Sequence, residues 1–200
     1  MAASMDNNPS KHSRYLDDAM YDRLLSLVAD WRRTSPVRRA ERPNADTCQD
    51  CESILFTEAR LADDLHLEDW LECYDKECIY WIPSGHAQID PRKEVTLEIH
   101  DRRRLEDRVT RIRTGLAYSM VPPIRTRHML SNIELWYGAE REVLARASFI
   151  IDALFKGQHR ILSGWCGYEL RQYNDNWLIT VKQINLIDAD LPQENNTFFL

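Results

Sequence analysis

The C-terminal part of the chain contains four β-rich segments that follow one another with only short breaks. The segments are 127–137, 142–155, 159–173 and 177–188. The breaks hold the turn-forming sequences Tyr137-Gly138-Ala139-Glu140, Lys156-Gly157-Gln158 and Asn174-Asp175-Asn176. Consecutive strands joined by short turns predict an antiparallel meander. Because the segments exceed the usual strand length of about five or six residues, we expect a strongly curved sheet.

The last of these segments changes the face on which its apolar residues lie. Trp177, Ile179 and Val181 alternate with polar residues, whereas Ile184 and Leu186 follow with the opposite parity. A shift of one residue moves every following side chain to the other face of a sheet. The pattern therefore predicts a β-bulge in this strand.

The N-terminal part indicates one amphipathic helix. Between Tyr15 and Arg33 the apolar residues recur at helical spacing, namely Leu16, Met20, Leu24, Leu27, Val28 and Trp31. The pattern stops at Thr34-Ser35-Pro36, and the sequence through Asp46 is typical of a loop. We therefore assign residues 1–46 to an N-terminal extension, either a linker or an arm laid over a neighbour, and residues 47–200 to one domain.

From Thr47 onward the pattern favours helices followed by strands. Thr47 and Asp50 are candidate caps of a helix whose apolar stripe is Ile54, Leu55, Ala59, Leu61, Ala62 and Leu65. A short helix at Leu67 to Tyr74, a strand at Cys78–Pro83, and a strand leading into a helix over Val95 to Arg113 are expected next. Helices followed by a meander predict an α+β domain, a cone in which helices pack inside a strongly curved sheet.

Composition excludes several classes of protein. Two hundred residues with 44% hydrophobic content can bury a core of ordinary size. A formal net charge of -6 argues against general nucleic-acid binding, which needs a basic surface. No apolar run approaches eighteen residues, and the start lacks the pattern of a signal peptide, so we expect a soluble cytoplasmic chain that does not enter a membrane.

Candidate metal ligands are scattered along the chain. The five cysteines are an odd number, which favours free thiols, and Cys48 and Cys51 form a C-x-x-C without the second ligand pair of a zinc site. The six histidines form no pair at metal-ligand spacing. We therefore expect no metal and no cofactor in this chain.

A cationic stretch at residues 111–128 reads RIRTGLAYSMVPPIRTRH and contains no acidic residue. Pro122-Pro123 excludes helix and predicts a stiff loop. Arginine suits fork-like pairing with carboxylates and stacking on aromatic rings, and a stiff loop loses little entropy on docking. We interpret Arg111, Arg113, Arg125 and Arg127 as a protein interface, with Trp81 as a further candidate; pairing within the domain remains the alternative.

An enzymatic alternative rests on the pocket that a cone can hold. Asp64, His66, Tyr80 and His128 are residues from which an acid and a base could be assembled, as an isomerase or dehydratase would need. A binding module for small apolar ligands is a third possibility, which would show a cavity without such a pair.

Several segments between about residue 50 and the end of the sequence form a set of motifs. They are Phe56 to Asp64, Trp70 to Tyr74, Ile79 to Pro83, the sequence RRRLEDRVTRIRTG at residues 102–115, Pro122 to Ile133, Asn185 to Asp188 and Phe198 to Leu200. In this order they resemble the small (beta) subunits of aromatic-ring-hydroxylating (Rieske-type) dioxygenases.

This resemblance implies a nuclear-transport-factor-2-like (cystatin-like) cone. It also implies a large alpha subunit as partner, usually in an α3β3 complex in which copies of the small subunit form a trimer. The alpha subunit would carry the Rieske 2Fe-2S cluster and the mononuclear Fe(II), with electrons arriving through a reductase or ferredoxin. The small subunit of that family is mainly structural, which implies a non-catalytic role in the oxygenation of an aromatic compound.

Overall fold

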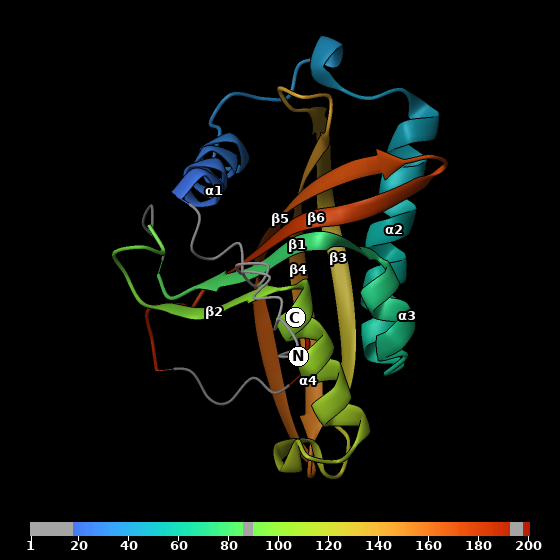
Figure 1. The fold of residues 1–200 in the computed structure, drawn as a ribbon, viewed down its shortest axis with the longest axis vertical. Coiled ribbons are helices and arrows are strands. Elements are labelled where there is room, and N and C mark those ends of the chain that lie inside the picture. Colours follow the sequence, from blue (N-terminus) through green and yellow to red (C-terminus); the bar gives the residue numbers. More distant parts are fainter. Residues whose placement is uncertain (1–17, 86–89, 193–197) are drawn as a thin grey trace, which may run out of the picture.

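A six-stranded, strongly curved sheet forms the centre of the protein (Figure 1). The computed structural model describes residues 18–85, 90–192 and 198–200. The strands lie in the order β2-β1-β6-β5-β4-β3, and only β1 and β6 run parallel to each other. Their bounds are β1 Tyr74–Pro83, β2 Thr96–Asp101, β3 Arg125–Tyr137, β4 Val143–Phe155, β5 Gln158–Tyr173 and β6 Asn176–Leu186.

The predicted meander is confirmed as β3 to β6, since each of these strands pairs with the next in antiparallel register. The predicted bulge is also present. Glu169 of β5 pairs with Val181 and Leu170 pairs with Ile179, so Thr180 is the extra residue of β6. The bulge lies nearer the start of β6 than the apolar pattern indicated. Val181 follows the bulge and faces the outer side of the sheet. It is apolar there because α1 covers that side.

The helices are α1 Asp18–Trp31, α2 Ala45–Asp63, α3 Leu67–Glu72 and α4 Arg102–Arg113, with 3-10 turns η2 Arg39–Glu41 and η3 Tyr118–Met120. Helices α2, α3 and α4 bury their apolar residues in the main core, on the inner face of the curved sheet. Helix α2 begins before its predicted caps Thr47 and Asp50. The side chain of Asn44 accepts a hydrogen bond of 2.8 Å from the backbone N–H of Thr47, so Asn44 is the cap.

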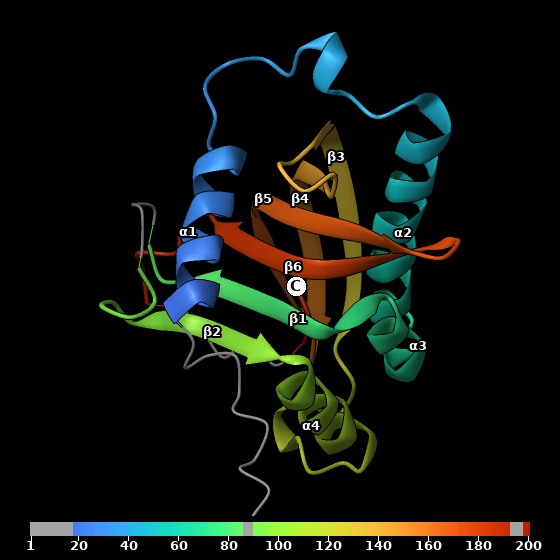
Figure 2. The ribbon, with the colours of Figure 1, turned by 45° about the horizontal axis from the view of Figure 1, so that its top comes forward.

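Helix α1 covers the opposite, outer face of the sheet (Figure 2). Its buried residues Leu24, Val28 and Trp31 pack in one cluster with Trp81 and Val181. The helix thus covers this chain's own sheet and does not leave its apolar face for a neighbour. Residues 15–17 of the predicted helix lie outside the described residues, and the 47–200 domain boundary falls inside the first turn of α2.

Trp81 lies beneath α1 with no exposed surface, and its indole N–H donates to the Thr96 hydroxyl at 2.9 Å. A side chain without exposed surface has nothing to offer another subunit, so Trp81 does not belong to the predicted interface. The apolar sequence of β1 reflects burial on both faces of this strand. Among the helices that the structure describes, none has the length and hydropathy needed to span a membrane.

Candidate functional site

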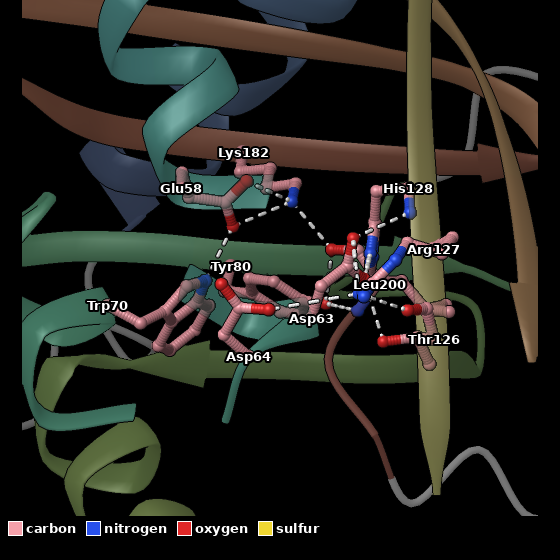
Figure 3. Close-up of polar contacts among 10 residues, drawn as sticks. All are labelled: Glu58, Asp63, Asp64, Trp70, Tyr80, Thr126, Arg127, His128, Lys182 and Leu200. Atoms are coloured by element: carbon pink, nitrogen blue, oxygen red, sulfur yellow. Dashed lines mark hydrogen bonds and ion pairs between the residues drawn. The ribbon is translucent and has the colours of Figure 1, made fainter. Parts of the chain in front are cut away.

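A polar cluster joins the end of α2 to the beginning of β3 (Figure 3). The Asp63 carboxylate accepts hydrogen bonds from the Thr126 hydroxyl at 2.7 Å, from the backbone N–H of His128 at 3.0 Å and from the His128 ring Nδ1 at 2.6 Å. The side chains of Asp63 and His128 are 8% and 4% exposed. Three hydrogen bonds to one buried carboxylate hold the helix and the strand together.

The environment of Asp63 keeps this carboxylate ionised. Burial alone raises the pKa of Asp63, but the hydrogen bonds from the His128 ring, the His128 backbone and Thr126 outweigh it and hold the pKa below its usual value. Since an ionised carboxylate can only accept, Nδ1 of His128 is the donor. The pair has the form of a base and its orienting acid, and its two nearly buried side chains form part of the wall of a groove between α2 and β3.

The structure brings two of the four residues of the enzymatic alternative to one groove and leaves the other two elsewhere. Asp64 and His128 line a groove of about 410 Å³ between α2 and β3, where Asp64 lies 3.8 Å from Arg127. His66 is exposed at the start of α3, 3.7 Å from Asp69. Tyr80 is fully buried in the interior, where its hydroxyl bonds to Leu200. Asp64 and His128 therefore share one groove, whereas His66 and Tyr80 lie outside it.

A second polar cluster lies in the interior of the cone (Figure 3). The Lys182 ammonium contacts both carboxylate oxygens of Glu58 at 2.9 and 3.1 Å, and both side chains are 2% exposed. Trp70 and Tyr74 each donate to Glu58 at 2.7 Å. Lys182 also donates to the carbonyl oxygen of Leu200 at 2.6 Å. Sequence reasoning missed this pair, although a lysine among the apolar residues of β6 was a signal for it.

The four arginines of the cationic stretch divide into two kinds. Arg113 pairs with Glu68 of α3 at 3.5 Å, and Arg127 lies 3.9 Å from Asp63 and 3.8 Å from Asp64. Arg111 and Arg125 are exposed, and neither forms an ion pair with another residue that the structure describes. Pairing within the domain therefore accounts for Arg113 and Arg127 but not for Arg111 and Arg125.

The described residues offer no cluster of three or more His, Cys, Asp or Glu side chains that could hold a metal ion. All five cysteine thiols are unpaired. Cys48 and Cys51 both belong to α2, and burial raises the pKa of the Cys51 thiol to about 12. A thiol with so high a pKa is a poor nucleophile and a poor metal ligand at neutral pH.

Residues 57–193 match the family described as ring hydroxylating beta subunit, which is more than half of the chain. The chain belongs to this family. The small oxygenase component of the p-cumate 2,3-dioxygenase system of Pseudomonas putida is 30% identical over 139 residues, which cover 68% of this chain and 77% of that protein. The 2-halobenzoate 1,2-dioxygenase small subunit of Burkholderia cepacia is 41% identical over 102 residues, covering 48% of this chain and 62% of that protein.

The fold agrees with this membership. The crystal structure of the beta subunit of benzoate 1,2-dioxygenase from Burkholderia mallei superposes with a TM-score of 0.62 at 24% identity, covering 83% of this chain and all of that one. The family resemblance and the nuclear-transport-factor-2-like cone are thus confirmed. The matched segments span about half to six tenths of the length of the first curated relatives.

Proposed function

We propose that this chain is the structural, non-catalytic small subunit of a dioxygenase that adds O2 to an aromatic ring during aromatic catabolism. Its family membership supports this role. The relatives are named for halobenzoate and p-cumate dioxygenases, which supports a carboxylated aromatic substrate. We place the substrate pocket in the partner chain.

The proposed partner is a large alpha subunit, in an α3β3 complex whose base is a trimer of this chain. The alpha subunit would carry the Rieske 2Fe-2S cluster and the mononuclear Fe(II), and a reductase or ferredoxin would supply its electrons. We expect this complex in the cytoplasm.

The observation that carries the proposal is the surface around the loop between α4 and β3, which we name the docking loop and define as residues 111–125. Leu116, Tyr118 and Val121 are 57%, 80% and 57% exposed. Arg111 and Arg125 flank them without an ion-pair partner among the described residues. Exposed apolar and aromatic side chains beside arginine are typical of protein interfaces. The docking loop is therefore the proposed contact surface for another subunit.

Coexpression tests the proposal. The partner gene is recognised by paired Cys-x-His and Cys-x-x-His motifs, and the two chains are purified together. We expect a complex whose mass corresponds to more than one copy of each chain, and ring hydroxylation that decreases when this chain is omitted. A stable monomer that never copurifies with such a partner, or turnover by this chain alone, contradicts the proposal.

A further inference from the structure

Residues Phe198–Leu200, which we name the internal tripeptide, lie inside the cone with the core residues. They are 7%, 3% and 3% exposed, and the C-terminal label lies within the outline of the fold in both views (Figures 1 and 2). Groups from α3, β1, α4 and β6 surround them. The tripeptide is therefore held as a ligand would be, by side chains that come from distant parts of the sequence.

The surrounding groups form a slot for one aromatic ring. The ring of Phe199 stacks on Trp70, with 4.1 Å between centroids and an interplanar angle of 29°. The Arg108 guanidinium lies over the same ring at 4.4 Å from its centroid, and Tyr80 meets it edge-on at 6.4 Å. A tryptophan, a tyrosine and a cation around one ring select an aromatic group over an aliphatic group of similar size.

Beside the ring slot is a position for an oxygen acceptor. The carbonyl oxygen of Leu200 accepts hydrogen bonds from Lys182 at 2.6 Å and from the Tyr80 hydroxyl at 3.0 Å. The same hydroxyl accepts from the Leu200 N–H at 2.8 Å. An ammonium and a hydroxyl that converge on one oxygen can bind a carboxylate oxygen as well as a carbonyl oxygen.

Three of the surrounding side chains, those of Lys182, Trp70 and Arg108, also have partners outside the internal tripeptide, although Arg108 donates to the Phe198 carbonyl oxygen as well at 2.8 Å. Glu58 orients both Lys182 and Trp70, and Glu98 contacts Arg108 at 2.6 Å. Phe198 also lines a hollow of about 240 Å³ together with Ile124, Phe155 and Arg160. These three side chains therefore keep a partner when the tripeptide is removed, which lowers the entropy cost of binding a ligand in its place.

We propose that the interior of this cone is a binding site for small aromatic carboxylic acids, and that Phe198–Leu200 occupy it as a tethered internal ligand. The proposal concerns this chain by itself and stands whether or not the chain assembles with a large subunit. A tethered ligand competes at an effective concentration of the order of mM, so an external ligand binds well only when the tripeptide is weakened.

Calorimetric titration with phenylacetate tests the proposal in three proteins, namely the full chain, its Phe199→Ala variant and a chain that ends at Thr197. The affinity should rise in this order, by roughly tenfold or more between the first and the last. Cyclohexylacetate lacks the aromatic ring and 2-phenylethanol lacks the carboxylate, so both should bind the shortened chain more weakly. No rise in affinity, or equal binding of cyclohexylacetate, overturns the proposal.

Two controls separate this site from an ordinary cavity. Phe149→Ala removes a ring of equal size from the same core, where Phe149 is 3% exposed, and should create no phenylacetate binding. Lys182→Met with Glu58→Gln in the shortened chain should make phenylacetate and 2-phenylethanol bind alike. If the shortened chain does not fold, the full-length Phe199→Ala variant decides. Phenylacetate must then raise its melting temperature more than that of the full chain, and equal shifts overturn the proposal.

Discussion

At the scale of single residues, the buried ion pair between Glu58 and Lys182 is the least replaceable polar feature of the core. Each charge has the other as its counterion, and Trp70 and Tyr74 occupy further acceptor positions of Glu58. A buried charge that loses its partner keeps the full penalty of desolvation. The two residues should therefore behave as a unit in unfolding experiments.

Lys182→Met should lower the free energy of unfolding by about 3–5 kcal/mol, because Glu58 would remain buried without a cation. The double variant Lys182→Met with Glu58→Gln should recover most of this loss, since a glutamine carbonyl still accepts from Trp70 and Tyr74. Urea unfolding of the two variants and the parent chain measures both effects. Equal destabilisation of the single and double variants would show that the charges are not coupled.

His100 is a second residue whose burial has a measurable consequence. Burial, followed by the charges of Arg108 and Arg104, lowers the pKa of His100 from 6.5 to about 4. Between these values the unfolded chain binds a proton and the folded chain does not. The stability that neutral His100 provides is thus present above pH 6.5 and is lost as the pH falls toward 4.

We expect the free energy of unfolding to decrease between pH 6.5 and pH 4, and His100→Gln to flatten this decrease. Urea unfolding at several pH values in this range measures the difference. Asp63 also makes the free energy of unfolding fall with pH, but only at lower pH, around and below the pKa of 3.8 that its carboxyl has in the unfolded chain. If the free energy of unfolding falls equally with pH in the parent chain and in the variant, His100 is not the titrating group.

At the scale of elements, the attachment of α1 to the outer face of the sheet depends on a close approach. A Cβ atom at Gly167 would lie 2.3 Å from the ring of Trp31, so only glycine allows the indole to lie against β5. The Trp31 indole N–H donates to the Tyr168 carbonyl at 3.2 Å, and Arg23 pairs with the buried Glu169. Helix α1 is thus fixed in its second turn by an ion pair and at its end by an aromatic contact.

Gly167→Ala should displace Trp31 and reduce stability by about 1–3 kcal/mol, as overpacking of a core does. Hydrogen exchange should show faster exchange in α1 and little change in α2. Adding Trp31→Leu to Gly167→Ala should restore part of the protection, because leucine is smaller than the indole. Unchanged exchange in α1 would mean that the helix does not depend on this contact.

At the scale of the whole molecule, exposed arginines lie at two opposite ends of the cone. The docking loop lies at the end of the cone near α4, and η2 lies at the opposite end (Figure 1). Arg111 and Arg125 at the docking loop and Arg39 in η2 are all exposed arginines. A charge change at either end should leave the core unaffected, so the two ends can be compared directly.

Arg111→Glu with Arg125→Glu should weaken assembly with the alpha subunit by at least roughly tenfold, because like charges oppose docking. Their effect on the stability of the isolated chain should stay within about 0.5 kcal/mol. Arg39→Glu is the matched control and should assemble normally. Size-exclusion chromatography of coexpressed chains measures the fraction assembled, and an unchanged yield of complex would place the interface elsewhere.

Much of the fold could be predicted because the signals are local. Turn residues and alternation located the strands of the meander, and helical spacing located the apolar faces of α1 and α2. Two errors occurred on β1 and β6, where α1 covers the second face of the strand. Trp81 and Val181 are apolar because α1 covers them, so one was mistaken for interface and the other displaced the predicted bulge.

The sequence by itself determined the order of the elements, the family, and the local excess of positive charge at residues 111–128, because each of these depends on residues close together in the chain. Only the tertiary structure decided which charges meet. Glu58 and Lys182 lie 124 positions apart, and Asp63 and His128 lie 65 apart. Curvature of the sheet brings these partners together, and no local pattern encodes that distance. For the same reason only the fold could show that Arg113 and Arg127 are paired within the chain, whereas Arg111 and Arg125 remain exposed.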